Sequence, residues 1–127
     1  MRTNRRRPRE PDVHELSIAQ SVVEAVEKEL ESQPGAQLRK IGLRIGELSG
    51  VDADSLRFSW ECLTRETGFE GVALVIEARA WQRRCPPCDI VFAVSDYQTV
   101  CPQCGTRETE HAGGNELDIA YLELETP

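Results

Sequence analysis

Two pairs of cysteines constrain this chain more than any other feature of its sequence. Cys85-Pro-Pro-Cys88 and Cys101-Pro-Gln-Cys104 share a two-residue spacer, and Gly105 follows the second pair. This spacing lets both sulfur atoms of a pair face one ion, and four thiolates close a tetrahedron around zinc at about 2.3 Å. Such a closed site organises a fold and leaves no open position for activating water. The sequence therefore predicts a structural zinc site whose ligands are Cys85, Cys88, Cys101 and Cys104.

The five cysteines fit disulfides or an iron site less well than zinc. A disulfide framework would leave one cysteine unpaired. We see no secretory signal, so we expect the chain to stay in the cytosol, where thiols are kept reduced. A rubredoxin-like iron site is the second alternative, because tetrahedral sulfur also suits iron, and red colour with iron content would identify it. Cys62 lies outside both pairs, and we expect it to be a small buried hydrophobe without a functional role. We expect His111 to lie exposed in a loop.

Length and charge narrow the class of protein. A chain of 127 residues can bury one modest core, with a small appendage at most. The net charge is −7, and it becomes −10 without residues 1–12, which hold five Arg, Glu10 and Asp12. This acidic balance weighs against a nucleic-acid-binding surface. Because no apolar run approaches the roughly 20 residues of a membrane helix, we expect a cytoplasmic protein without membrane contact.

Apolar periodicity predicts two helices. The first begins at or just before a capping box at Ser17–Gln20 and runs until Pro34-Gly35 stops it. The second is capped by Asp52 or Asp54 and ends before Thr67-Gly68. Each helix has one apolar face, formed by Ala19, Val22, Val23, Val26 and Leu30 in the first and by Leu56, Trp60 and Leu63 in the second.

Strand patterns complete the prediction of the fold. Alternating or apolar residues predict strands at about 37–47, at 72–78 and at 116–125. Regular patterns fade between Trp81 and Gly114, where the cysteine pairs lie. We therefore predict an α+β fold, a small layer of two helices on a three-stranded sheet with an inserted zinc-ribbon subdomain.

The predicted order of the chain has three parts. Residues 1–12 have no apolar periodicity and contain two prolines, which predicts a disordered tail or a mis-assigned start. Residues 13–80 together with 114–127 form the predicted α/β domain. Residues 81–113 form the predicted zinc-ribbon insertion.

Several segments together resemble the HypA/HybF hydrogenase maturation proteins. The resemblance rests on VHELSIAQS at 13–21, IGELS at 45–49, the two cysteine pairs and GNELDI at 114–119, so it covers nearly the whole chain from Val13. It implies a nickel metallochaperone that loads Ni(II) into the large subunit of nickel-iron hydrogenase and works with the GTPase HypB. It also implies a nickel site separate from the zinc ribbon.

In the resembled family, nickel is held by an amino-terminal Met-His-Glu, which maps onto Val13, His14 and Glu15. A His at position two lets the terminal amine, its own amide nitrogen and its imidazole form adjoining chelate rings suited to square-planar Ni(II). Here residues 1–12 precede Val13, so that amine would be a peptide nitrogen. Because a GTG codon encodes Val internally but Met at initiation, we expect the native chain to begin at position 13.

The sequence offers little support for catalysis. It contains no HExxH, GxSxG or P-loop pattern, and Gly46-Glu47-Leu48-Ser49-Gly50 lacks the Lys and spacing of a phosphate loop. We therefore expect a non-enzyme. The alternative function is a zinc-ribbon interaction or nucleic-acid-binding module, which Arg83-Arg84 favours and the acidic balance opposes.

Overall fold

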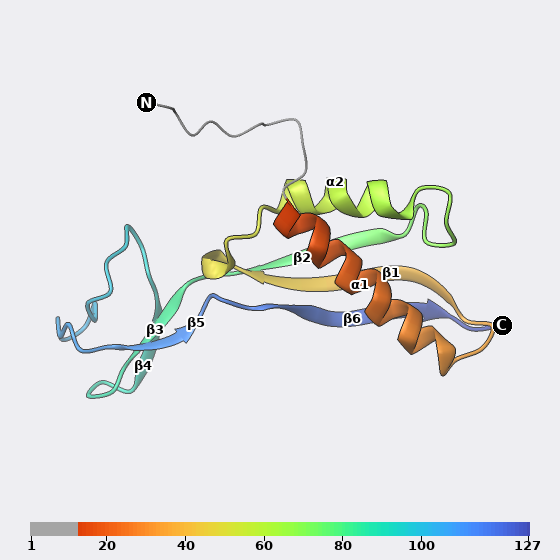
Figure 1. The fold of residues 1–127 in the computed structure, drawn as a ribbon. Helices are drawn as coiled ribbons and strands as arrows, with labels where there is room; N and C mark the ends of the chain where they lie inside the picture. Colours follow the sequence, from red (N-terminus) through yellow and green to blue (C-terminus); the bar gives the residue numbers. More distant parts are fainter. Residues whose placement is uncertain (1–12) are drawn as a thin grey trace, which may run out of the picture. The chain divides into compact units, whose positions relative to one another are not determined.

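A computed structural model describes residues 13–127, and the predicted tail at 1–12 lies outside the described residues. The described chain forms two α-helices and two three-stranded sheets (Figure 1), which confirms the predicted α+β class. By contacts it divides into two compact units. Of the described residues, the first comprises 13–41, 51–74 and 122–127, and the second comprises 42–50 and 75–121. The predicted domain boundaries at 80/81 and 113/114 remain a prediction.

Helix α1 (Val13–Glu31) begins four residues before the predicted capping box. Ser17 is therefore exposed inside the helix, and the prediction that it caps the helix is wrong. The first turn is fixed by a tertiary contact instead: the buried carboxylate of Glu15 accepts a hydrogen bond from the backbone N–H of Asp52 at 2.9 Å. In the turn that follows Glu31, Gly35 has a φ of 86°. This is a left-handed backbone conformation, which glycine adopts without strain.

Helix α2 (Ala53–Thr64) starts where predicted, directly after Asp52, and ends earlier than predicted. Asp52 is its N-cap residue without a side-chain cap bond; its carboxylate instead accepts from the hydroxyl of Ser55 at 2.7 Å. Leu56 and Trp60 are buried as the periodicity predicts, and Trp60 stacks with Phe69 at 6.4 Å between ring centroids. Cys62 is exposed on this helix, so the prediction of a buried cysteine is wrong.

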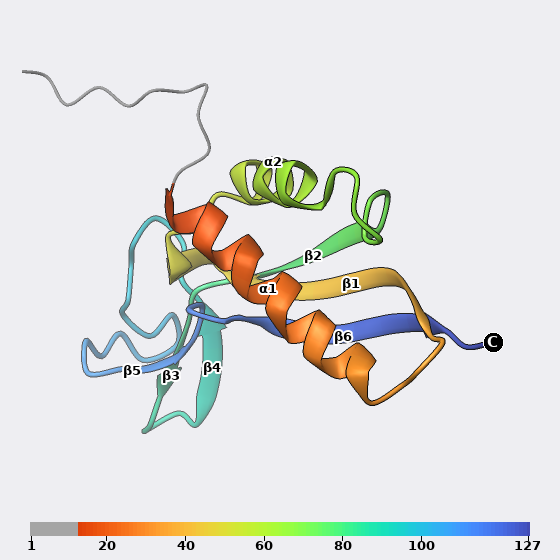
Figure 2. The same ribbon diagram turned by 45° about the vertical axis from the view of Figure 1, so that its right-hand side comes forward.

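The first sheet has the order β2-β1-β6. Its strands are β1 (Gln37–Gly46), β2 (Ala73–Arg79) and β6 (Leu117–Glu125), each within two residues of its predicted range. In Figures 1 and 2, β1 and β2 run in the same direction and β6 runs against them. Within the first unit, α1 and α2 pack on each other, and their buried faces form a core with Leu38 and Ile41 of β1 and Leu74 of β2.

The second sheet was not predicted. It has the order β4-β3-β5 and lies wholly in the cysteine segment, as β3 (Gln82–Cys85), β4 (Ile90–Ala93) and β5 (Glu110–Gly113). Both neighbours pair antiparallel with β3, and Cys85 pairs with Ile90 across the first hairpin. Strands of four residues are too short to show a clear period, so residue pattern alone does not reveal them. No helix among residues 13–127 is long and apolar enough to cross a membrane.

Candidate metal centres

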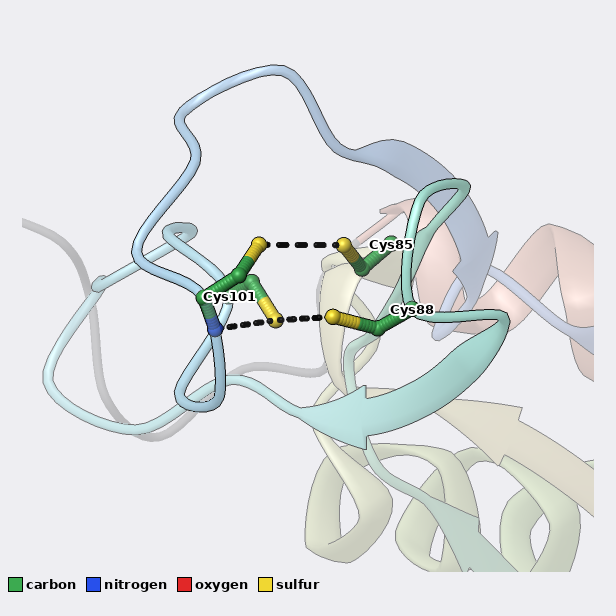
Figure 3. A group of neighbouring side chains, drawn as sticks. Cys85, Cys88 and Cys101 are labelled. Atoms are coloured by element: carbon green, nitrogen blue, oxygen red, sulfur yellow. Dashed lines mark hydrogen bonds between the residues drawn. The ribbon is translucent and has the colours of Figure 1, made fainter.

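The four paired cysteines meet at the end of the second sheet. Cys85 ends β3, Cys88 lies in the turn before β4, and the second pair lies in the loop between β4 and β5. The Sγ atoms of Cys85 and Cys104 are 3.7 Å apart, and those of Cys88 and Cys101 are 4.0 Å apart. All four sulfur atoms lie within 4.8 Å of one another. Figure 3 shows the sulfur atoms of Cys85, Cys88 and Cys101 turned toward the same point.

These separations distinguish a metal site from disulfides. A tetrahedron with bonds of about 2.3 Å places its sulfur atoms about 3.8 Å apart, whereas a disulfide joins them at about 2.0 Å. The observed 3.7 and 4.0 Å match the tetrahedron. The described residues hold no other group of three or more Cys, His, Asp or Glu side chains close enough to share an ion. The arrangement therefore fits one structural zinc ion.

Each cysteine pair forms a similar turn. The N–H of Asp89 donates to the carbonyl of Cys85 at 2.7 Å, and the N–H of Gly105 donates to the carbonyl of Cys101 at 2.9 Å. Asp89 and Gly105 hold equivalent places after their pairs, with φ values of 54° and 78°. Positive φ at this place turns the chain sharply enough for both sulfur atoms of a pair to face inward. The glycine after the second pair is thus explained by backbone geometry.

The surroundings of the cysteine thiols shift their pKa values in different directions. Burial raises the pKa of the Cys88 thiol to about 12, and burial also raises the pKa of Cys85. Burial acts in the same direction on Cys101, but backbone N–H groups of Cys104 and Gln103 outweigh it and lower the pKa of Cys101 to about 6. Four thiols this close together cannot all lose their protons unless a cation compensates the negative charge of the resulting thiolates. A divalent ion supplies the charge that makes a closed set of thiolates stable.

The residues predicted to bind nickel lie in the first turn of α1. His14 is exposed there, and the side chain of Val13 lies outside the described part of the structure. Glu15 is 1% exposed, so its side chain points into the protein while that of the preceding His14 meets solvent. One carboxylate oxygen of Glu15 accepts from Asp52, and the other has no hydrogen-bond partner among the described residues. His111 is exposed as predicted, although it lies in β5 and not in a loop.

Replacing Glu15 with alanine should loosen the contact between the starts of the two helices. We expect the free energy of unfolding to fall by about 2 kcal/mol, because a part-buried hydrogen bond is lost and the N–H of Asp52 is left without its partner. Glu15→Gln retains a carbonyl oxygen that can accept this bond, so it should lose clearly less. Urea unfolding of both variants measures the difference. Equal losses would show that the hydrogen bond is not what Glu15 contributes.

Comparison with known proteins gives a consistent result. The sequence model of the HypA family, described as "Hydrogenase/urease nickel incorporation, metallochaperone, hypA", matches residues 13–124. The chain is 42% identical over 113 residues to a hydrogenase maturation factor HypA from Geobacter metallireducens, covering 89% of this chain and all of the relative. It is 35% identical over 116 residues to the HypA of Azotobacter vinelandii, with 89% and 100% covered.

Two solved structures resemble the fold. The solution structure of the nickel metallochaperone HypA from Helicobacter pylori matches with a TM-score of 0.58 at 23% identity and covers 89% of this chain and 98% of its own. A second solution structure, of a HypA protein, matches with a TM-score of 0.65 at 24% identity and covers 91% and 99%. At these identities the structures support the fold.

Proposed function

The chain belongs to the HypA family of hydrogenase maturation nickel metallochaperones, and we propose that it carries Ni(II) at the start of α1 and releases it to a hydrogenase partner. It is a metallochaperone and not an enzyme. Its resident metal is the structural zinc that the four-cysteine cluster fits, and nickel is its cargo. The observation that supports the placement of the cargo site is the exposed His14 in the first turn of α1.

His14 is the central nickel ligand in this proposal. An exposed imidazole in a first helical turn can take up and release an ion without opening the core. With the chain beginning at position 13, His14 becomes residue two, and the terminal amine, the amide nitrogen and the imidazole can surround Ni(II) in a plane. In this proposal Glu15 positions the nickel ligands and does not bind the ion itself, because its buried carboxylate joins the start of α1 to Asp52 at the start of α2.

We propose position 13 as the native start for this reason. The family match begins at Val13, which is also the first residue of α1. In this proposal a Met at position 13 provides the free amine that an internal Val cannot. Nickel binding then depends on a backbone group that exists only at the amino terminus.

The zinc ribbon has a different task in this proposal. A closed set of four thiolates holds β3, β4 and β5 in a defined arrangement that can be presented to partners, since strands of four residues cannot be stable alone. We propose a HypB-type GTPase and the large subunit of nickel-iron hydrogenase as these partners. Reduced thiolates of this kind persist in the cytoplasm, where we place the protein.

Nickel titration by calorimetry tests the proposal directly. Two forms are compared, the chain as given and a form beginning with Met at position 13. We expect only the shorter form to bind one nickel ion tightly, because only it offers the amine beside His14. In the shorter form, His14→Ala should weaken nickel binding at least about 100-fold, since the imidazole that chelates nickel together with the terminal amine is lost.

His111→Ala is the matched control, because His111 is the other histidine of the chain and is also exposed. It should bind nickel as the parent does. If both forms bind nickel equally, the amine at position 13 is not a nickel ligand, and the proposed native start loses its chemical support. If neither binds nickel, the cargo site is not at His14, and the zinc-ribbon interaction module becomes the better account of the chain.

A further inference from the structure

The loop after β4 contains a tight turn with an unusual residue. The N–H of Gln98 donates to the carbonyl of Ser95 at 3.0 Å, and these two residues form an isolated antiparallel bridge. Between them, Asp96 and Tyr97 both have positive φ, of 54° and 59°. Two positive φ values at the centre define a type I′ turn, in which Asp-Gly is a favoured pair. Tyr97 occupies the place that suits glycine, and a bulky side chain is strained there.

Burial does not offset this strain. Tyr97 is 87% exposed, the highest value among the exposed large apolar or aromatic side chains of the described chain. Its ring meets the half-buried Trp81 edge to face, with 6.4 Å between ring centroids and 62° between ring planes. The strained turn exposes an aromatic ring to solvent. Binding of a partner explains such a turn better than a contribution to the stability of the fold does.

Two carboxylates accompany the aromatic pair. The backbone N–H of Trp81 donates to Oε1 of Glu47 at 3.0 Å, which holds that acidic side chain at the start of the ribbon. Asp96 precedes Tyr97 in the turn, and both acidic residues are exposed. Aromatic faces combined with carboxylates attract the guanidinium of Arg and the ammonium of Lys. We call Glu47, Trp81, Asp96 and Tyr97 the aromatic-acidic surface.

We propose that the aromatic-acidic surface is a docking site for a basic segment of a partner protein, with an Arg or Lys side chain held against Trp81 and Tyr97. The inference deepens the proposed function, because a metallochaperone must dock before its cargo can be transferred. Charge supports this occupant: residues 13–127 carry a net charge of −10, which attracts a basic protein segment and repels nucleic acid. The surface lies outside the four cysteines and outside the start of α1.

The test is an NMR titration of the zinc-loaded full chain, without nickel, with the peptide acetyl-Gly-Arg-Gly-Arg-Gly-amide. Trp60 provides an internal reference, because it is 3% exposed and is the other of two tryptophans. We expect the indole resonance of Trp81 to shift in a saturable way while that of Trp60 stays in place. A peptide with Gln in place of both Arg should cause no saturable shift.

Tyr97→Gly separates recognition from stability. Glycine is favoured at this turn position, so we expect the melting temperature to stay the same or rise. The affinity for the Arg peptide should fall about two- to fivefold, the size of one exposed cation–π contact. Tyr97→Phe keeps the ring and should bind as the parent does. Val91→Ala removes another exposed apolar side chain of the ribbon and should also leave the affinity unchanged.

Three results would overturn the proposal. The first is equal binding of the Arg and Gln peptides, and the second is parental affinity in Tyr97→Gly. The third is loss of zinc or a lower melting temperature in Tyr97→Gly, which would show that the tyrosine serves the fold. Because the titration contains no nickel, its result is independent of the calorimetry that tests the cargo site.

Discussion

Replacing Cys85 with alanine should abolish stoichiometric zinc binding and unfold the ribbon. Cys85 is fully buried, ends β3, and places its sulfur 3.7 Å from that of Cys104. Three remaining thiolates cannot close the tetrahedron, and the strands of four residues have little core of their own. Zinc measured by atomic emission should fall from about one ion per chain to near zero. Amide hydrogen exchange should show protection lost across residues 82–113.

Cys62→Ala is the matched control for this experiment. Cys62 is the fifth cysteine and is exposed on α2, outside the cluster of the other four, so its replacement should leave zinc content and exchange protection unchanged. Full zinc content in Cys85→Ala would contradict the four-thiolate site. Retained protection without zinc would show that the ribbon folds through its own packing.

Adding a single methyl group at Gly46 should destabilise the protein by roughly 3 kcal/mol, a large effect for so small a change. A Cβ built on Gly46 would lie 2.0 Å from the carbonyl oxygen of Gly114 and 2.7 Å from the backbone nitrogen of Asn115. Both obstacles are backbone atoms, so no side chain can turn aside. The backbones are also hydrogen-bonded here, since the N–H of Leu48 donates to the carbonyl of Gly114 at 2.6 Å.

Urea unfolding of Gly46→Ala measures this cost. Gly68→Ala is the control, because nothing lies within 4 Å of a Cβ at Gly68 and its φ is not in the left-handed range. That variant should differ from the parent by less than about 0.5 kcal/mol, as surface substitutions usually do. Similar stability of the two variants would mean that the close approach of Gly46 and Gly114 is not maintained in solution.

The close approach of these glycines also gives a physical reason for two motifs of the sequence. The segments at 45–49 and 114–119 carried much of the family resemblance without a visible role. In the structure they meet: the N–H of Gly46 donates to the carbonyl of Glu116 at 2.8 Å, beside the contact with Gly114. Sequence comparison could identify these motifs, but only the fold shows that they are two sides of one backbone contact.

Local pattern predicted the features that depend on neighbouring residues. The spacing of the cysteine pairs indicated the turns that gather four sulfur atoms, and periods of 3.6 and 2 indicated the helices and the strands of the first sheet. The predictions for Ser17 and Cys62 were wrong because tertiary contacts outweighed local preference. Glu15 accepts a hydrogen bond from Asp52, which is 37 residues away, and this contact holds the turn that precedes Ser17 in the helix. In α2, Leu56 and Trp60 are buried in the core, whereas Cys62 faces solvent.

The sequence by itself determined the metal chemistry, the α+β class and the family, because each depends on residue types at short spacing or on motifs that can be recognised along the chain. The tertiary structure alone decided which groups meet over long separations. These are the bond of Glu15 to Asp52, the contact of Gly46 with Gly114, and the display of Tyr97 against Trp81. Such contacts depend on the path of the whole backbone, which no local spacing encodes.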